Sequence, residues 1–147
     1  MEILVRRLGA EDAALAQGLF ALMSAVFGEP QRPLDRRYLE GLLASQGFWA
    51  MAAFSGGELL GGLTAHSLPM TRVEAAEVFV YDLAVQERHQ GQGVGRALVA
   101  ALREHCGAQG IHVVFVPADD EDVHALEFYK AIGGRPSPVT FFTFGEG

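Results

Sequence analysis

Three glycines at alternate positions, Gly91, Gly93 and Gly95, stand between an apolar run and a helical pattern. Glycine leaves little side-chain bulk at such a turn, so several backbone N–H groups can point at one anion. The positive end of the helix dipole lies behind these groups and favours negative charge. These residue types at this spacing therefore predict a phosphate-binding turn at the start of a helix.

Three phosphate-binding motifs contain such glycines, and the neighbouring residues show which of the three this sequence matches. A P-loop requires a lysine and a serine or threonine after its last glycine, whereas Arg96 and Ala97 follow here. A dinucleotide fingerprint has the spacing G-x-G-x-x-G in a first βαβ unit, whereas these glycines are spaced G-x-G-x-G late in the chain. The pattern that fits is Q-x-x-G-x-G, met by Gln90 to Gly95. A glycine-rich helix start without a ligand is the remaining alternative.

Several side chains outside this turn could move protons. Asp82 stands in an otherwise apolar strand pattern, where an ionised side chain is costly unless it faces a cleft or a partner. Glu77, at the start of the same strand, is an alternative base, and so is His124, since imidazoles titrate near neutral pH. Tyr129 could donate a proton, because phenols are protonated at neutral pH. The residue pattern alone also allows Tyr129 to be a core residue beside Phe128.

Four consecutive acids, Asp119, Asp120, Glu121 and Asp122, lie between a strand pattern and a helical pattern. Acids stabilise helix N-termini, and Asp122 is placed to cap a helix that begins at Val123. A cap accounts for one or two acids but not for four. The run therefore favours an acidic wall for a polycationic ligand. The histidines show no spacing typical of a metal site, and we expect none.

The elements that position these residues follow from apolar periodicity and from turn residues. Helices are expected over residues 11–27, 36–45 and 123–132, and from Val94 to the glycines at 107 and 110. Strands are expected over residues 2–7, 48–54, 58–67, 77–85, 111–117 and 138–144. The order βααβββαβαβ predicts a single α/β (α+β) domain over residues 1–147, with a mixed sheet flanked by helices.

Composition limits the class of protein. Half of the 147 residues are hydrophobic and a fifth are charged, which excludes a disordered chain. The apolar runs are too short to cross a bilayer, the first residues lack a signal-peptide layout, and the single Cys106 fits a reducing compartment. We therefore expect a cytoplasmic protein with no membrane partner. The formal charge of −7 argues against nucleic acid and allows a cationic substrate.

Two motifs together resemble the GNAT family of acyl-CoA N-acyltransferases. Gln90–Gly95 is similar to that family's pyrophosphate-binding motif, and Ala125–Tyr129 with Gly133 is similar to its A-x-x-F-Y-x-x-x-G segment. Within the family, residues 38–142 resemble the small aminoglycoside 3-N-acetyltransferases of the gentamicin-resistance type. The run Tyr81–Val85 (YDLAV) carries much of that likeness, whereas positions 120–121 and 123–124 depart from the pattern.

The resemblance implies a mostly antiparallel GNAT sheet and acetyl-CoA as cofactor. It implies that backbone N–H groups of the glycine turn bind the pyrophosphate and that the end of the central strand pairs with the pantetheine arm. The Leu83 N–H would then lie close to the thioester carbonyl. The cofactor-binding residues expected are Leu83, Ala84, Val85, Gln90, Gly91, Gln92, Gly93, Val94, Gly95 and Arg96.

The resemblance also implies acetyl transfer to an amino group of an aminoglycoside, at its 3-position. In that reaction Tyr129 would protonate the leaving thiolate and Asp82 would be the base. Asp82 and the acidic run 119–122 would bind the cationic substrate. Two alternatives stay open: acetylation of a polyamine, small metabolite or protein amine, and an acyl-CoA sensor without catalysis. A homodimer is plausible if residues 139–144 form an edge strand.

Overall fold

The computed structural model describes residues 1–146, and the chain divides into two compact units, Met1–Pro117 and a C-terminal unit that begins at Ala118. The first unit holds one five-stranded sheet in the order β1-β2-β3-β4-β5, in which only β4 and β5 are parallel. Its strands are β1 (Leu4–Arg7), β2 (Phe48–Ser55), β3 (Glu58–Pro69), β4 (Ala76–Val85) and β5 (Val114–Phe115). Its helices are α1 (Ala13–Val26), α2 (Arg36–Ala44), η1 (Glu87–His89) and α3 (Val94–Ala108). This is the α/β architecture with a mixed sheet that the sequence predicts.

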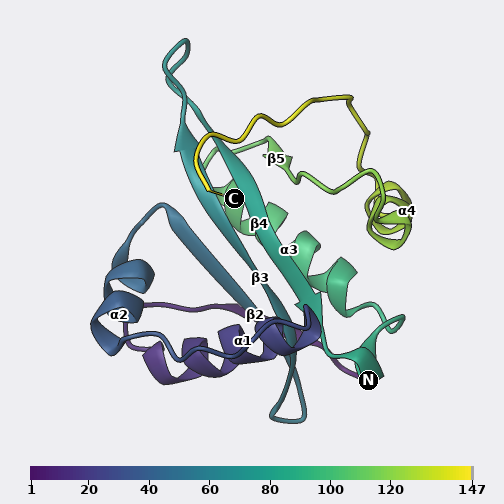
Figure 1. The fold of residues 1–147 in the computed structure, drawn as a ribbon. Coiled ribbons are helices and arrows are strands. Elements are labelled where there is room, and N and C mark those ends of the chain that lie inside the picture. The colour runs from purple at the N-terminus through teal and green to yellow at the C-terminus, as the bar shows by residue number, and fades with distance from the viewer. Residues whose placement is uncertain (147) are drawn as a thin grey trace. The chain divides into compact units, whose positions relative to one another are not determined.

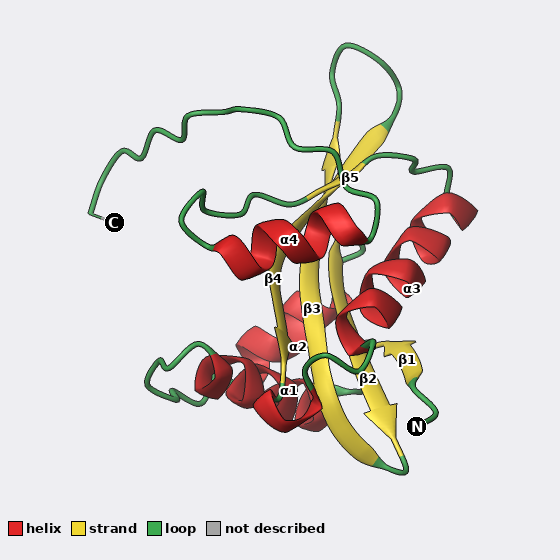
Figure 2. Ribbon diagram, turned by 90° about the vertical axis from the view of Figure 1, so that its right-hand side faces the viewer, coloured by secondary structure: helices red, strands yellow, loops and turns green. Residues whose placement is uncertain are grey.

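The two faces of the sheet carry separate cores, because β-strand side chains alternate between faces. Helices α1 and α2 lie on one face and α3 lies on the other (Figures 1 and 2). We call these the α1/α2 face and the α3 face. The core of the α1/α2 face includes Leu19, Leu39 and Phe48. The core of the α3 face includes Trp49 and Leu98, and also Cys106, whose thiol is fully buried. Burial raises the pKa of that thiol, so Cys106 acts as a packing residue.

The C-terminal unit contains helix α4 (Val123–Ala131), which begins where the sequence predicts. The side chain of Asp122 caps this helix by accepting a hydrogen bond of 3.1 Å from the Ala125 N–H. The N–H of Gly134 donates to the carbonyl of Tyr129 over 2.8 Å, and Gly133 has a φ of +103°. A residue with a side chain would be strained at that φ, which explains why α4 ends at a glycine pair.

Two strand predictions need correction. Residues 138–144 do not form the predicted strand; they are irregular, and no register of the sheet includes them. The strand predicted over residues 111–117 shrinks to Val114–Phe115. A strand exists only where its backbone groups pair with a neighbour, and the periodicity of a segment does not supply that neighbour.

Gly62 in β3 provides a test of the packing between α1 and the sheet. A Cβ at this position would lie 2.5 Å from Leu19 Cδ1 and 2.6 Å from the carbonyl oxygen of Met51. We expect Gly62→Ala to lower the free energy of unfolding by about 1–3 kcal/mol, because the backbone carbonyl cannot move aside. Gly41→Ala in α2 is the matched control, since a Cβ there meets nothing within 4 Å. Equal urea midpoints for the two variants would contradict this packing.

No helix among residues 1–146 is both long enough and apolar enough to span a bilayer.

Candidate active site

A β-bulge in β4 decides which way Asp82 faces. Asp82 is in register with Thr64 and Val80 with Ala65, so Tyr81 is an extra residue without a register partner. Before the bulge, Val78 and Val80 belong to the core of the α3 face. An extra residue reverses the alternation that follows it, and Ala84 accordingly packs in the core of the α1/α2 face. Asp82, two residues before Ala84, therefore lies on the α1/α2 face.

The carboxyl group of Asp82 is half-buried, and its pKa is raised. Burial is the main cause, because it disfavours the charged form; the negative charge of Glu29 adds to it. Glu29 follows α1, which places a second carboxylate on the same face. Glu29 could not be found from the sequence, since its only local signal is that it lies between Gly28 and Pro30 in a helix-breaking segment.

The glycine turn has the form that the sequence predicts. Gly91 and Gly93 have φ values of +76° and +90°, and a Cβ at either would meet nothing within 4 Å. Gly93 is the N-cap of α3 and provides no side chain to cap it. The first N–H groups of a helix have no acceptor within the helix, so those of α3 are open to an anion. Arg96 is exposed in the first turn of the same helix.

Glutamine side chains hold this turn in place. Gln86 Nε2 donates to the carbonyl of Leu59 over 2.7 Å, and Gln90 Nε2 donates to the carbonyl of Val85 over 3.0 Å. Gln92 Nε2 donates to the carbonyl of Arg88 over 3.3 Å. The side chains of Gln90 and Gln92 thus shape the turn, which leaves binding of an anion to its backbone. Arg88, at the same turn, is paired with Glu58.

Strands β4 and β5 are paired over only two residues. Their register ends at Phe79 and Phe115, whereas β4 continues to Val85. Between Phe79 and Val85, no residue of β5 is in register with β4. This separation leaves the end of β4, including Leu83, Ala84 and Val85, without a β5 neighbour, next to the glycine turn.

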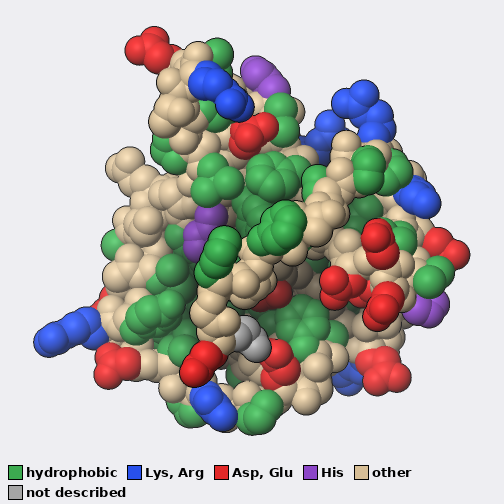
Figure 3. All heavy atoms as spheres, turned by 45° about the horizontal axis from the view of Figure 1, so that its top comes forward, with side chains coloured by type: hydrophobic (Ala, Val, Ile, Leu, Met, Phe, Trp, Pro, Cys, Tyr) green, Lys and Arg blue, Asp and Glu red, His purple; other side chains and the backbone are tan. Residues whose placement is uncertain are grey.

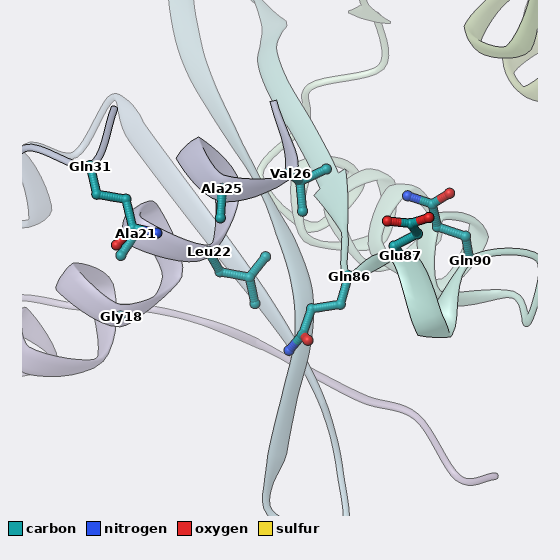
Figure 4. A pocket seen from close by; sticks show the side chains of 9 residues that line it. All are labelled: Gly18, Ala21, Leu22, Ala25, Val26, Gln31, Gln86, Glu87 and Gln90. Carbon is teal, nitrogen blue, oxygen red and sulfur yellow. The ribbon is translucent and has the colours of Figure 1, made fainter. Parts of the chain in front are cut away.

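A cavity of about 690 Å³ adjoins the glycine turn. One wall is α1, with small and apolar side chains that include Ala25 and Val26; the other wall is formed by Gln86, Glu87 and Gln90 (Figure 4). A volume of this size is typical of pockets for small molecules. Gln90 belongs both to the cavity and to the glycine turn, so the two features are continuous.

In the C-terminal unit, Tyr129 and the acidic run lie at opposite ends of α4. The Tyr129 ring is half-buried and packs edge-on against Phe128, with ring centroids 5.0 Å apart. Asp119, Asp120, Glu121 and Asp122 are all exposed. Asp122 is used as the helix cap, as predicted, and His124 is exposed in the first turn of α4.

Comparison with known proteins identifies the family. The pattern of the Acetyltransferase (GNAT) family matches residues 16–133. The chain belongs to the GNAT acetyltransferase family. As in other GNAT proteins, its cofactor is acetyl-CoA.

Solved structures similar to this GNAT chain include two aminoglycoside acetyltransferases from uncultured soil metagenomic samples. HMB0005 is 33% identical with a TM-score of 0.92, and the match covers 99% of this chain and 100% of that one. The protein meta-AAC0020, solved in complex with sisomicin, is 29% identical with a TM-score of 0.93, and the match covers 99% of this chain and 97% of that one.

Among sequence relatives, the mycothiol acetyltransferase of Paenarthrobacter aurescens is 32% identical over 100 residues. The match covers 68% of this chain and 31% of that protein. The corresponding protein of Streptomyces scabiei is 33% identical over 105 residues, which are 70% of this chain and 32% of that protein. The chain thus spans about a third of the length of these relatives.

The residues of this GNAT domain fit acetyl-CoA. The glycine turn, which we also call the diphosphate cradle, has empty space where a Cβ of Gly91 or Gly93 would project. No side chain caps α3, so a diphosphate can approach the backbone there. Beside it, the end of β4 has no β5 neighbour that would occupy the place of an extended pantetheine arm. Both features lie within the unit Met1–Pro117.

Proposed function

We propose that this protein transfers the acetyl group of acetyl-CoA to an amino group of an aminoglycoside, at its 3-position. The observation that carries the proposal is the half-buried Asp82, which the Tyr81 bulge turns to the same face as Glu29. Two full-length matches with TM-scores of 0.92 and 0.93 to aminoglycoside acetyltransferases support the substrate class. We propose the 3-position because the YDLAV run resembles that of the 3-N-acetyltransferases.

The cofactor site consists of the backbone from Gln90 to Arg96 together with the end of β4. Acetyl-CoA supplies an acetyl group activated as a thioester. The N–H groups at the start of α3 hold its diphosphate, with the helix dipole behind them. Residues Leu83 to Val85 would hold its extended arm by backbone pairing, and the Leu83 N–H would be the donor that stabilises the charge developing on the thioester carbonyl.

Asp82 would accept the proton of the substrate ammonium, so that the neutral amine can attack the thioester carbonyl. The C–N bond forms, the C–S bond breaks, and the second proton that the nitrogen loses balances the proton that the thiolate gains. Its raised pKa suits this role, because a carboxylate with a raised pKa is a stronger base. Asp82 and the exposed acids 119–122 provide negative charge that attracts a polycation.

Tyr129 is the proposed acid that protonates the departing thiolate. We expect Tyr129→Phe to lower kcat by about 100-fold, the typical size of a general-acid contribution, while the Kd of coenzyme A stays unchanged. Steady-state kinetics and isothermal titration calorimetry measure the two quantities. Tyr38→Phe, at an exposed tyrosine of α2, is the matched control. An unchanged kcat for Tyr129→Phe would remove Tyr129 from the mechanism.

A second candidate substrate is the amine of a different small metabolite, since sequence relatives include mycothiol acetyltransferases. A thiol-release assay with acetyl-CoA tests the choice against a panel of aminoglycosides, polyamines, amino-sugar metabolites and peptides. Turnover of aminoglycosides alone supports the first proposal, and turnover of another amine alone supports the second. Binding of acetyl-CoA without any turnover would indicate a sensor.

A homodimer is also part of the proposal, on a different ground from the predicted edge strand, because residues 139–144 form no strand. Its support is the segment Val139–Phe144, in which Phe141, Phe142 and Phe144 are 68%, 80% and 96% exposed. Exposed apolar side chains in one segment are typical of interaction sites.

A further inference from the structure

Aromatic side chains form a row across four strands of the sheet. The register aligns Phe48 with His66, His66 with Phe79, and Phe79 with Phe115. Ring centroids are 5.4 Å apart for Phe48 and His66, and 5.2 Å apart for Phe79 and Phe115. Tyr81, the bulge residue, lies 6.0 Å from the ring of His66 and 6.1 Å from that of Phe79. We call Phe48, His66, Phe79, Tyr81 and Phe115 the aromatic row.

The aromatic row runs from the core to the surface on the α1/α2 face. Its first ring, Phe48, is 6% exposed and packs edge-on against Phe20 of α1. At its other end, Phe115 is 39% exposed. Tyr81, which lies beside His66 and Phe79 in the middle of the row, is 65% exposed. Figure 3 shows large apolar side chains (green) exposed at the surface of the molecule. Burying such rings would be favourable, so an exposed group of them on one face of a sheet indicates a binding surface.

The negative charge beside Tyr81 indicates what kind of ligand the exposed rings can bind. Asp82 directly follows Tyr81 and lies on the same face, and Glu29 is near enough to raise the pKa of Asp82. A ligand held there must tolerate two carboxylates and also bury the faces of aromatic rings. An amine-bearing saturated ring meets both needs, because its C–H faces stack on aromatic rings and its ammonium groups are attracted to carboxylates and to ring faces.

We propose that the exposed part of the aromatic row, above all Tyr81, is a stacking surface for a ring of the cationic amine substrate. This rests on the proposed function and deepens it, since it assigns the recognition of the ring to Tyr81 and the recognition of its charge to Asp82. Tyr81 acts through its ring face, and its hydroxyl group is not required.

The test compares binding of sisomicin and of coenzyme A by isothermal titration calorimetry. Tyr81→Ala is expected to raise the Kd of sisomicin about 10-fold, which corresponds to about 1.4 kcal/mol, and to leave the Kd of coenzyme A unchanged. Tyr81→Phe keeps the ring and should bind both ligands like the wild type. Tyr81→Leu keeps apolar area without a ring and should show an intermediate loss. Tyr38→Ala is the matched control, because Tyr38 is 60% exposed but stands on α2.

Three results would overturn the stacking surface while the proposed function stands. The first is a wild type that binds and acetylates sisomicin together with a Tyr81→Ala variant that binds it equally well. The second is an equal loss of sisomicin binding in Tyr81→Ala and Tyr38→Ala. The third is a loss in Tyr81→Phe as large as in Tyr81→Ala, because the hydroxyl would then be the recognised group. A wild type that binds coenzyme A but not sisomicin would overturn both the surface and the aminoglycoside proposal.

Discussion

Asp82→Asn is expected to lower kcat/KM for sisomicin acetylation by roughly 100-fold or more, the usual contribution of a general base. The amide keeps the shape of the side chain but cannot accept the proton of the ammonium group. A thiol-release assay at saturating acetyl-CoA measures the effect. The Kd of coenzyme A should not change, because Asp82 is not part of the diphosphate cradle.

The same variant should be more stable at neutral pH. Burial and Glu29 raise the pKa of Asp82 in the folded state, so folding favours the protonated carboxyl. The stability that this group contributes is fully present below its unfolded pKa and is lost as the pH rises through its folded pKa. At pH 7 the wild type therefore carries an unfavourable charge that asparagine lacks. The gain should stay below about 1 kcal/mol because solvent screens a half-exposed group, and it should shrink as the pH falls towards 4.

Glu77→Gln tests whether Asp82 or Glu77, the other acid of β4, is the general base. Glu77 is in register with Leu68, four residues along β3 from Thr64, the partner of Asp82. That spacing corresponds to about 13 Å along the strand, too far for the two carboxylates to share one proton. We expect Glu77→Gln to keep most of the activity. If Glu77→Gln is inactive and Asp82→Asn is active, the assignment of the base is wrong.

Gly93→Val is expected to weaken binding of coenzyme A by at least about 100-fold, or roughly 3 kcal/mol. The space around Gly93 is empty, so the added side chain would occupy the volume that the diphosphate needs. A valine at a φ of +90° is also strained, which should destabilise the fold by about 1–2 kcal/mol. Calorimetry with coenzyme A and urea unfolding measure the two effects separately.

Gly110→Val is the control that distinguishes the effect of backbone strain from the loss of coenzyme A binding. Gly110 has a φ of +77°, and a Cβ there also meets nothing within 4 Å, but it lies beyond the opposite end of α3. This variant should lose similar stability and bind coenzyme A like the wild type. Tight binding of coenzyme A by Gly93→Val would mean that the diphosphate does not occupy the cradle.

Several parts of this protein follow from local sequence. The turn from Gln90 to Gly95 could be predicted because glycine conformations and helix N-termini are determined by nearby residues. The cap at Asp122 could be predicted for the same reason, and the structure confirms it. Helices α1 to α4 were predicted to within two residues at most ends, since apolar periodicity marks their buried faces.

Only the tertiary structure decided which face of the sheet Asp82 lies on and how far its carboxyl group is buried. Its environment depends on the bulge at Tyr81, which exists through a shift of register between β3 and β4. The aromatic row could not be predicted from the sequence either, since its members are brought together by pairing between strands. The same dependence on pairing explains the strand wrongly predicted over residues 138–144. Register and pairing are relations between distant segments, whereas a sequence pattern reports only how one segment would bury its own side chains.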